Sequence, residues 1–481
     1  MRATYKFAVS VLLVVSGIGG TQCAQAQTVP QNSDVEKRLG LLERKLEQLE
    51  QRVNAAVPAS VEAAVSDDRL EALDQKLRIL ERNRELEQEG LAAKAKQTPV
   101  VAAGKDGFSL QSADKSFQLK VGGYVHADGR FFPDDNAHVG TDNFVLRRVR
   151  PVLQGTVFQS VDFRIMPDFG EGKSVLQDAY IDFRYFPLTV LRAGKFKGPV
   201  GLERLQSATD ILFAERALPT NLVPNRDLGL QVWGDIAGRV NYAVGVFNGA
   251  PDGGSVDGDT NDGKDFAARL FLTPFAKSQV DHPLRGLGFG AAVTTGRQEG
   301  SVLPSFKSSG QSTFFSYSSG VLAAGRRLRY SPQAYFYYGP LGLLGEYVQS
   351  NQQVAKGTSQ AEIANHAWQV SASYFLTGEK NGYKHSSPRH NFEGRSGGAG
   401  AWELAARFSD LAVDQRAFTG RFADPAKSAS SANAWAIGLN WYLNKYAKLV
   451  FDYEQTHFQG GALNGDRPTE KAFFNRLQIA F

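Results

Sequence analysis

Apolar and polar residues alternate one by one along the last nine residues of the chain, 473–481. In an extended strand this period of two separates two faces. The apolar face would hold Phe473, Leu477, Ile479 and Phe481, and the polar face Arg476 and Gln478. Two-faced strands of this kind form the wall between lipid and a water-filled interior.

The same period begins near Phe117 and continues through the rest of the chain. The first segment alternates the apolar residues Phe117, Leu119, Val121, Val125 and Phe131 with the polar residues Lys120, Tyr124, His126, Asp128 and Arg130. A later segment places Val240, Tyr242, Val244 and Val246 outward and Asn241, Ala243 and Gly245 inward. Further strands are predicted to begin near Phe144, Val161, Val175, Thr189, Leu228, Asp265, Leu287, Arg327, Leu341, His366, Trp402, Ala434 and Lys448.

These segments amount to about 16 strands, an even number wide enough for an aqueous channel. We therefore predict an all-β fold, a transmembrane antiparallel β-barrel. A soluble β-sandwich is the alternative, and the strand number and the aromatic ends disfavour it. Tight connections are expected at residues 186–188, 235–239 and 444–445, and long polar ones at 132–143, 248–264 and 379–400. Short turns typically belong to the periplasmic rim and long loops to the outside.

A different pattern precedes the barrel. Apolar residues recur at spacings of four and three, the heptad pattern of a coiled coil. The first seam holds Val35, Leu39, Leu42, Leu46, Leu49 and Val53, and the second holds Leu70, Leu73, Leu77 and Leu80. The sequence predicts an N-terminal α-helical coiled-coil segment that joins protomers in the periplasm. A lone amphipathic helix is the alternative.

The first residues predict export. Arg2 and Lys6 form a positive region, residues 7–18 are apolar, and residues 24–26 read Ala-Gln-Ala, a typical cleavage site. The predicted boundaries are a signal peptide at 1–26, a periplasmic coiled coil and linker at 27–105, and the barrel at 106–481. The only cysteine, Cys23, precedes the cleavage site, so disulfide and thiol chemistry are not expected in the mature chain.

Composition excludes little but is consistent with this picture. Mean hydropathy is -0.29, and past the signal no apolar run approaches the length of a spanning helix. The formal net charge is +5, of which +3 remains once the two signal-peptide cations are removed. This excess is slight, so only the placement of the cations matters, and we expect no nucleic-acid partner.

Basic residues gather in the first third of the predicted barrel and are the candidate functional residues. The strand near Phe144 carries Arg148 and Arg150 on one face, with Arg147 at the other register. Further cations are Arg192, Lys195, Lys197, Arg204 and Arg216. The last two lie within residues 198–224, a stretch long enough to fold back into the lumen. A cation facing lipid at the midplane would cost about 2–4 kcal/mol, so these side chains are expected to face water or protein.

Arginine suits oxyanions because its planar fork of donors stays charged, and several forks around a constriction replace part of an anion's hydration shell. The alternative is that the cations line a wide pore, pair with Asp162, Asp168, Asp178 and Asp182, and select little.

A calcium loop at 257–268 is disfavoured because its glycine is one place late and Ala268 stands where the closing Glu belongs. The seven histidines are dispersed, without a triad or metal-ligand spacing, so a barrel hydrolase is the least favoured reading.

At these residues the chain resembles the phosphate-selective porin family. The resemblance rests on Leu146-Arg147-Arg148, Gln177-Asp178-Ala179, Arg192-Ala193-Gly194-Lys195-Phe196, Val200-Gly201-Leu202-Glu203-Arg204, Tyr374-Phe375-Leu376-Thr377-Gly378-Glu379, Ala401-Trp402-Glu403-Leu404 and Gly438-Leu439-Asn440-Trp441-Tyr442. It covers the whole barrel and is densest between Arg147 and Arg216.

The resemblance implies an outer-membrane homotrimer of barrels of about 16 strands, each narrowed by a loop folded into the lumen and lined by a ladder of Arg and Lys. By matching motifs, Arg147, Arg148, Arg192, Lys195, Arg204 and Arg216 resemble the family's basic constriction residues, and Asp178 its acidic one. Arg150 and Lys197 are additional cations that would favour more highly charged anions. The expected solutes are phosphate, pyrophosphate or related anions, passing without a cofactor, a metal or catalysis; a general, weakly selective porin is the alternative. Outer-membrane lipid is the other expected partner.

Overall fold

The structure, a computed structural model, describes residues 44–45, 47–48, 51, 67–95, 98–104, 107–133, 140–259, 261–279, 282–384, 386–394 and 397–481. The predicted signal peptide and all six apolar positions of the first heptad seam lie outside the described residues. The chain divides into two compact units, Met1–Ala92 and Ala93–Phe481.

The first unit contributes one long helix, α2 (Asp67–Ala95). The leucines of the second seam that can be described, Leu73, Leu77 and Leu80, are all more than half exposed along this helix. The structure describes one helix with an uncovered apolar row, and the coiled coil stays a prediction. Within the described part of the chain, no helix combines the length and the apolarity needed to cross a membrane.

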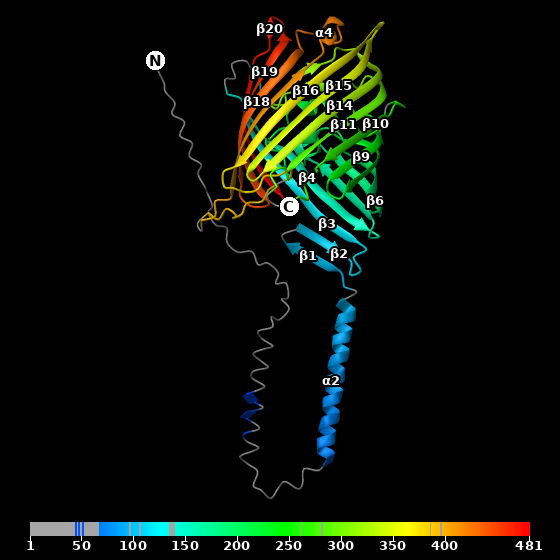
Figure 1. Cartoon of the computed structure of the whole chain (residues 1–481), viewed down its shortest axis with the longest axis vertical. Helices are drawn as coiled ribbons and strands as arrows, with labels where there is room; N and C mark the ends of the chain where they lie inside the picture. Colours follow the sequence, from blue (N-terminus) through cyan, green and yellow to red (C-terminus); the bar gives the residue numbers. More distant parts are fainter. Residues whose placement is uncertain are drawn as a thin grey trace. The chain divides into compact units, whose positions relative to one another are not determined.

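The second unit is an antiparallel β-barrel, as Figure 1 shows. The barrel strands are β3 (Gln118–Phe131), β4 (Asn143–Val157), β5 (Val161–Asp168), β6 (Val175–Phe186), β7 (Thr189–Phe196), β8 (Asp227–Ile236), β9 (Val240–Phe247), β10 (Asp265–Leu272), β11 (Leu287–Gly300), β14 (Leu322–Tyr338), β15 (Leu341–Lys356), β16 (Ser359–Phe375), β17 (Ala401–Ala412), β18 (Ala429–Tyr442), β19 (Ala447–Ala462) and β21 (Glu470–Ala480). These are 16 strands among the described residues. Most begin within three residues of a predicted start, but β14, β16 and β18 begin five, seven and five residues before Arg327, His366 and Ala434.

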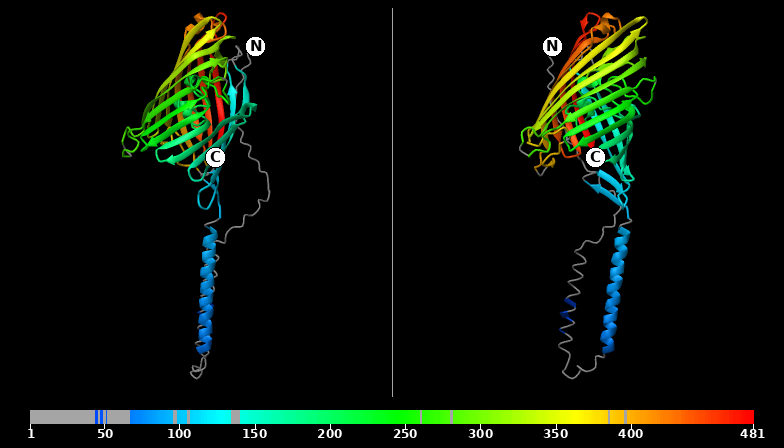
Figure 2. Two further views of the ribbon diagram at one scale, coloured as in Figure 1. Left: turned by 90° about the vertical axis from the view of Figure 1, so that its right-hand side faces the viewer. Right: turned by 45° about the vertical axis from the view of Figure 1, so that its right-hand side comes forward.

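The barrel closes between its first and last strands. β21 pairs antiparallel with β19 on one side and with β3 on the other, from Phe473 opposite Phe131 to Ala480 opposite Tyr124. The backbone of Phe481 exchanges two hydrogen bonds of 2.9 Å with Gly123. Figure 2 shows the red end of the chain beside the cyan first strand of the barrel. Closure satisfies the backbone donors and acceptors that an open edge would leave unpaired in lipid.

Side chains alternate across the wall as the sequence predicts. On β21, Phe474, Arg476 and Gln478 are buried inside the barrel, whereas Leu477 and Ile479 are exposed on the outer surface. The remaining elements are shorter. They are β1 (Val100–Gly104), β2 (Gly107–Gln111), η2 (Gly170–Gly172), α3 (Leu202–Leu205), η3 (Leu218–Leu222), β12 (Ser305–Lys307), β13 (Thr313–Ser316), α4 (Arg416–Thr419) and β20 (Gly465–Asp466). Strand β1 occupies residues for which the sequence predicts a linker.

The antiparallel order assigns every connection to one of two rims. We call the edge where β3 begins the proximal rim and the edge where it ends the distal rim. The tight turns at 187–188, 237–239 and 443–446 lie at the proximal rim, and the long connections 132–142 and 248–264 at the distal rim. This agrees with the sequence prediction for those five connections.

The sixth predicted connection, 379–400, is on the opposite rim from the one expected. It joins β16, which descends to the proximal rim, to β17, which leaves it. Phe392 N–H donates to Leu443 O at 2.6 Å and Asn381 N–H to Gly339 O at 2.8 Å, both acceptors in proximal turns. Loop length alone was therefore a wrong guide here, because strand parity fixes the rim.

Candidate functional site

Residues 197–226, between β7 and β8, fold into the barrel; we call them the lumen insert. Proline and glycine interrupt strand formation here, and the segment instead forms the single turns α3 and η3. Most of its apolar side chains are buried, including Val200, Leu202, Phe213 and Leu222. The insert is thus a packed structural element inside the barrel, as the length of this stretch predicts.

Inward-facing polar side chains of the wall hold the backbone of the insert. Glu346 on β15 accepts hydrogen bonds from the N–H groups of Leu202 at 2.6 Å and Glu203 at 3.3 Å. On β18, Asn440 donates to the carbonyl of Leu212 at 2.9 Å. These contacts satisfy backbone groups that a short irregular segment would otherwise leave unpaired.

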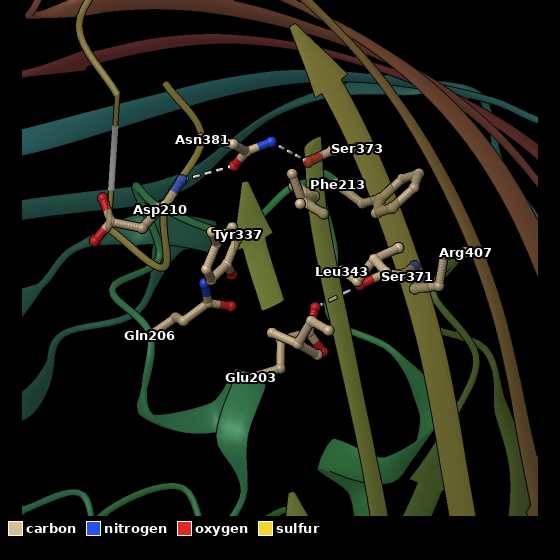
Figure 3. A pocket seen from close by; sticks show the side chains of 14 residues that line it. Glu203, Gln206, Asp210, Phe213, Tyr337, Leu343, Ser371, Ser373, Asn381 and Arg407 are labelled. Carbon is tan, nitrogen blue, oxygen red and sulfur yellow. Dashed lines mark hydrogen bonds and ion pairs between the residues drawn. The ribbon is translucent and has the colours of Figure 1, made fainter. Parts of the chain in front are cut away.

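A narrow cavity of about 20 Å³ separates the insert from this wall, and Figure 3 shows it at close range. Glu203 and Gln206 of the insert face Arg407 and Ser371 across it. Arg407 also lies 3.5 Å from the carboxylate of Glu203. At this cavity the insert and the wall leave room for little more than a water molecule.

Glu215 of the insert is the centre of an arginine cluster. Its carboxylate lies 2.6 Å from Arg147 and 3.5 Å from both Arg148 and Arg476. Arg130 lies 3.7 Å away. Burial alone would raise the pKa of Glu215, but Arg147 and Arg148 hold it well below its usual range. Glu215 stays ionised, and one carboxylate faces four guanidinium groups.

A β-bulge explains why both Arg147 and Arg148 reach Glu215. The register of β3 with β4 pairs His126 with Arg148 but Ala127 with Leu146, so Arg147 is the extra residue. A bulge redirects side chains. The sequence prediction placed Arg147 at the other register, and this was wrong because regular alternation does not hold across the bulge.

Two predicted site residues are held by aspartates of the wall. The Nε of Arg150 donates to Asp168 at 2.7 Å, and its Nη1 donates to the Tyr124 hydroxyl at 2.7 Å. Arg192 makes two hydrogen bonds of 2.7 Å to Asp182 and lies 3.9 Å from the centre of the Tyr180 ring. For these two arginines the paired arrangement considered from the sequence is the one observed.

Lys195 and Asp178, two further predicted residues, each pair with a different charged side chain. The Lys195 ammonium donates to Asp257 in the distal connection 248–264. Asp178 accepts from Arg226 at 3.1 Å and lies 3.5 Å from Arg164. Asp178 therefore fixes a cation that the sequence prediction did not include.

Three predicted residues, Lys197, Arg204 and Arg216, contact only neutral oxygen atoms within the described part of the chain. Lys197 and Arg216 both donate to the carbonyl oxygen of Gln206, at 2.6 and 2.8 Å. Arg204 bonds the Thr220 carbonyl and shares the side-chain oxygen of Asn225 with Arg226. We call Lys197, Arg204 and Arg216 the unpaired trio.

The charges of the unpaired trio oppose one another. Burial, followed by repulsion from Arg216 and Arg226, lowers the pKa of Arg204 to about 9. Burial and Arg216 likewise lower the pKa of Lys197 well below its usual value. A bound anion would remove this repulsion.

Arg204 and Arg216 share a cavity with Arg147 and Arg148. The cavity has a volume of about 400 Å³. It lies between the insert and the distal connections, whose contributions include Asp252, Lys307 and Gln311. Four guanidinium groups and one lysine face two carboxylates, Glu215 and Asp252, so positive charge is in excess here.

Sequence reasoning missed several residues of this site. Arg226, Glu203 and Glu215 lie in the lumen insert, and Arg130 and Arg476 lie on the first and last strands of the barrel. Only the inward register of Arg130 and Arg476 was a signal, since alternation places both in the lumen. Among the residues that the structure describes, no group of three or more His, Cys, Asp and Glu side chains has the arrangement of a metal site.

Comparisons with known proteins agree with this architecture. The family model described as phosphate-selective porin O and P matches residues 119–481. Porin O of Pseudomonas aeruginosa is 23% identical over 416 residues, which cover 79% of this chain and 92% of that protein. Among solved structures, the outer membrane channel DcaP of Acinetobacter baumannii aligns with a TM-score of 0.51 at 12% identity, covering 77% of this chain and 99% of its own. That alignment supports the fold.

Proposed function

The chain belongs to the phosphate-selective porin O and P family, and on that premise we propose that this outer-membrane channel passes phosphate-type oxyanions down their gradient. Membership in this family makes the protein an anion-selective porin and not an enzyme. Phosphate and pyrophosphate are the solutes we propose, and passage needs no cofactor. The observation that carries the proposal is the unpaired trio in the lumen insert.

An anion is the partner that the unpaired trio lacks. Its cations share neutral oxygens, which accept hydrogen bonds but do not neutralise charge. A phosphate at this point would accept hydrogen bonds from several forks at once, replacing part of its hydration shell. Among the described residues the trio forms no ion pair at contact distance, so binding favours anions, and each contact must stay weak enough to break, as conduction requires.

The paired cations have a second role in this proposal. Arg147, Arg148, Arg150, Arg192 and Lys195 are fixed by Glu215, Asp168, Asp182 and Asp257. A paired cation attracts an approaching anion less, but a guanidinium has five N–H donors, and those that its carboxylate does not use can still donate to an anion. We propose that Arg147 and Arg148 lead anions from the distal cavity to Arg204 and Arg216, which line the same cavity.

The alternative is a general, weakly selective porin. The ion pairs of the wall arginines favour this alternative. Arg150 and Arg192 are each held by an aspartate, so they add little net charge to the pore. If the unpaired trio were also neutralised in the membrane, for example by bound chloride at all times, selectivity among anions would vanish. The two functions differ in whether phosphate blocks chloride.

We also propose an orientation and an assembly. The proximal rim, where β3 begins and the tight turns lie, would face the periplasm, and the protein would form a homotrimer. The family resemblance supports the trimer. The exposed leucine row of α2 supports a coiled coil between protomers, because an apolar row of that length is normally covered.

Planar-bilayer recordings test the channel proposal. In a potassium chloride gradient the reversal potential should show anion preference, and added phosphate should reduce chloride current. Replacing Arg216→Gln should weaken this block about tenfold, since one charge-assisted contact is lost. The control Arg184→Gln removes a lumenal cation that is already paired with Asp162 at 2.6 Å, and it should leave the block near the wild-type level. Cation preference, or chloride current insensitive to phosphate, would contradict the proposal.

A further inference from the structure

Two arginines stand directly opposite each other on the outside of the barrel. Arg297 on β11 pairs in register with Arg326 on β14, and both are exposed. Their sequence neighbours Gln298 and Arg327 are buried in the lumen, where both bond Asp265. Because alternate side chains point to opposite faces, Arg297 and Arg326 project outward, away from the pore.

A bulge in β14 holds Arg326 in this position. Ala323 pairs with Val354 and Arg327 with Gln352, so four steps along β14 match only two steps along β15. Gly325, within the bulge, has a φ of +138°, and a Cβ there would lie 2.1 Å from the side-chain oxygen of Gln353. The same oxygen accepts the N–H of Arg326 at 2.8 Å. The outward direction of Arg326 is therefore built into the backbone.

The arginine pair lies just beyond the apolar band of the wall. The next outward pairs along the two strands are Thr295 with Leu328 and Val293 with Tyr330. Tyr330 and, on the neighbouring strand, Tyr347 both donate to the side-chain oxygen of Gln349. Tyrosines with bonded hydroxyls typically mark the interface between hydrocarbon and headgroups. Arginine side chains a few residues beyond that level reach the headgroup layer.

The pair carries a positive charge that the protein does not fully neutralise. Like charges directly opposite each other on a sheet are unfavourable. Within the described residues, the ion pair found here joins Arg297 to Glu299 at 3.2 Å, with side chains 77% and 63% exposed, so water screens it. Two guanidinium forks on neighbouring strands match the oxygens of a single phosphate.

We propose that Arg297 and Arg326 form a binding site for the phosphate of an anionic lipid headgroup. The site is outside the pore and does not depend on what the pore conducts; it rests only on the membrane location of the barrel. A lipid is favoured over free phosphate because its acyl chains would lie on the apolar face that continues below the pair, at Leu328 and Val293. Free phosphate gains nothing from that face.

Native mass spectrometry of the purified full chain in a neutral detergent tests this site. The probes are a short-chain phosphatidic acid, which carries a phosphate monoester, and the matching phosphatidylcholine. The wild type should retain phosphatidic acid about tenfold more tightly than the variant Arg297→Gln with Arg326→Gln. Glu299→Gln should tighten retention, because it removes the competing carboxylate. Phosphatidylcholine should bind equally to all forms.

The matched control replaces two exposed cations of the distal connection 413–428, Arg421→Gln with Lys427→Gln. It removes the same charge from the same rim but not from the pair, and it should retain phosphatidic acid like the wild type. The proposal would be overturned if the control lost as much phosphatidic acid retention as the Arg297 and Arg326 variant, or if that variant lost none. Displacement of the lipid by an equal concentration of inorganic phosphate would also overturn it. Chloride conductance of the variant, expected at the wild-type value, shows that the barrel is folded and keeps this test separate from the channel proposal.

Discussion

At the scale of single residues, the lumen separates cations by their partners. Arg150 and Arg192 have aspartates of the wall, whereas Lys197, Arg204 and Arg216 share neutral oxygens. The same residue type therefore contributes differently to the pore. A paired arginine fixes the position of its neighbours, and an unpaired one leaves a charge for a solute.

Arg150 offers a test of this distinction. Arg150→Ala removes a cation and also uncovers the carboxylate of Asp168, so anion preference should fall and phosphate block should weaken about threefold. Adding Asp168→Asn to the same variant removes the uncovered charge, and most of the block should return. Both variants are compared by chloride current under phosphate in planar bilayers. A double variant no better than the single one would mean that Arg150 contacts the anion itself.

Glu215 gives the barrel a pH dependence. Its pKa is held below the ordinary value of 4.5 in the folded protein, so it stabilises the fold above that pH. The contribution is lost progressively as the pH falls below about 5 toward the folded pKa. The midpoint of heat unfolding on gels should therefore fall on acidification more steeply for the wild type than for Glu215→Gln.

At neutral pH, Glu215→Gln should itself be less stable by about 3 kcal/mol, because four arginines lose their shared carboxylate. If the unfolding midpoints of the wild type and this variant fell equally steeply on acidification, Glu215 would not be the cause of the pH dependence. Glu171→Gln is the control, since the partly exposed Glu171 carboxylate lies 3.3 Å from Arg147, at the edge of the arginine cluster. This variant should change the pH dependence of the unfolding midpoint little.

At the scale of elements, the bulge in β4 determines the arginine cluster. Gly170, which follows β5, packs against the bulge so closely that a Cβ would lie 2.5 Å from the carbonyl oxygen of Arg147 and 2.9 Å from the Cα of Arg148. These are backbone atoms and cannot turn aside. The element that aims both arginines thus depends on a residue without a side chain.

Gly170→Ala should displace the bulge. We expect a loss of about 1–3 kcal/mol in stability, and weaker phosphate block because Arg147 and Arg148 shift. Gly258→Ala is the control, since a Cβ at Gly258 meets no atom within 4 Å. Thermal unfolding on gels and bilayer recordings measure the two effects. A Gly170→Ala protein indistinguishable from the control would show that the bulge is not rigid.

The elements also show how far the sequence reaches. A period of two is a local property, so most strand starts and the inward face of β21 could be predicted from neighbouring residues alone. The bulge in β4 could not be predicted in this way, because one extra residue in a strand does not change the kinds of residue found there. Nor could the contact of Glu215 with Arg147, 68 positions away, since pairing across the lumen depends on how the insert folds. The rim at which residues 379–400 lie could be predicted only by counting strands from β3, since successive connections alternate between the two rims. The length of this loop indicated the wrong rim.

At the scale of the whole molecule, the channel and the N-terminal segment are separate units. All the contacts of the lumen insert described above lie within residues 93–481. A chain lacking residues 35–86 should therefore keep its chloride conductance and its phosphate block. If the exposed leucines of α2 join protomers, the same deletion should lower the temperature at which oligomers dissociate on gels. Loss of conductance in folded barrels would contradict this division.

The closing seam has a consequence for biogenesis. Arg476 on the last strand binds Asp128 on the first across 348 positions, with two hydrogen bonds of 2.7 Å. The cylinder cannot close before synthesis and export of the final strand are complete, so until then two unpaired edges need protection from aggregation. A nonsense mutation that removes only the last dozen codons would yield nearly the whole polypeptide and still no closed cylinder.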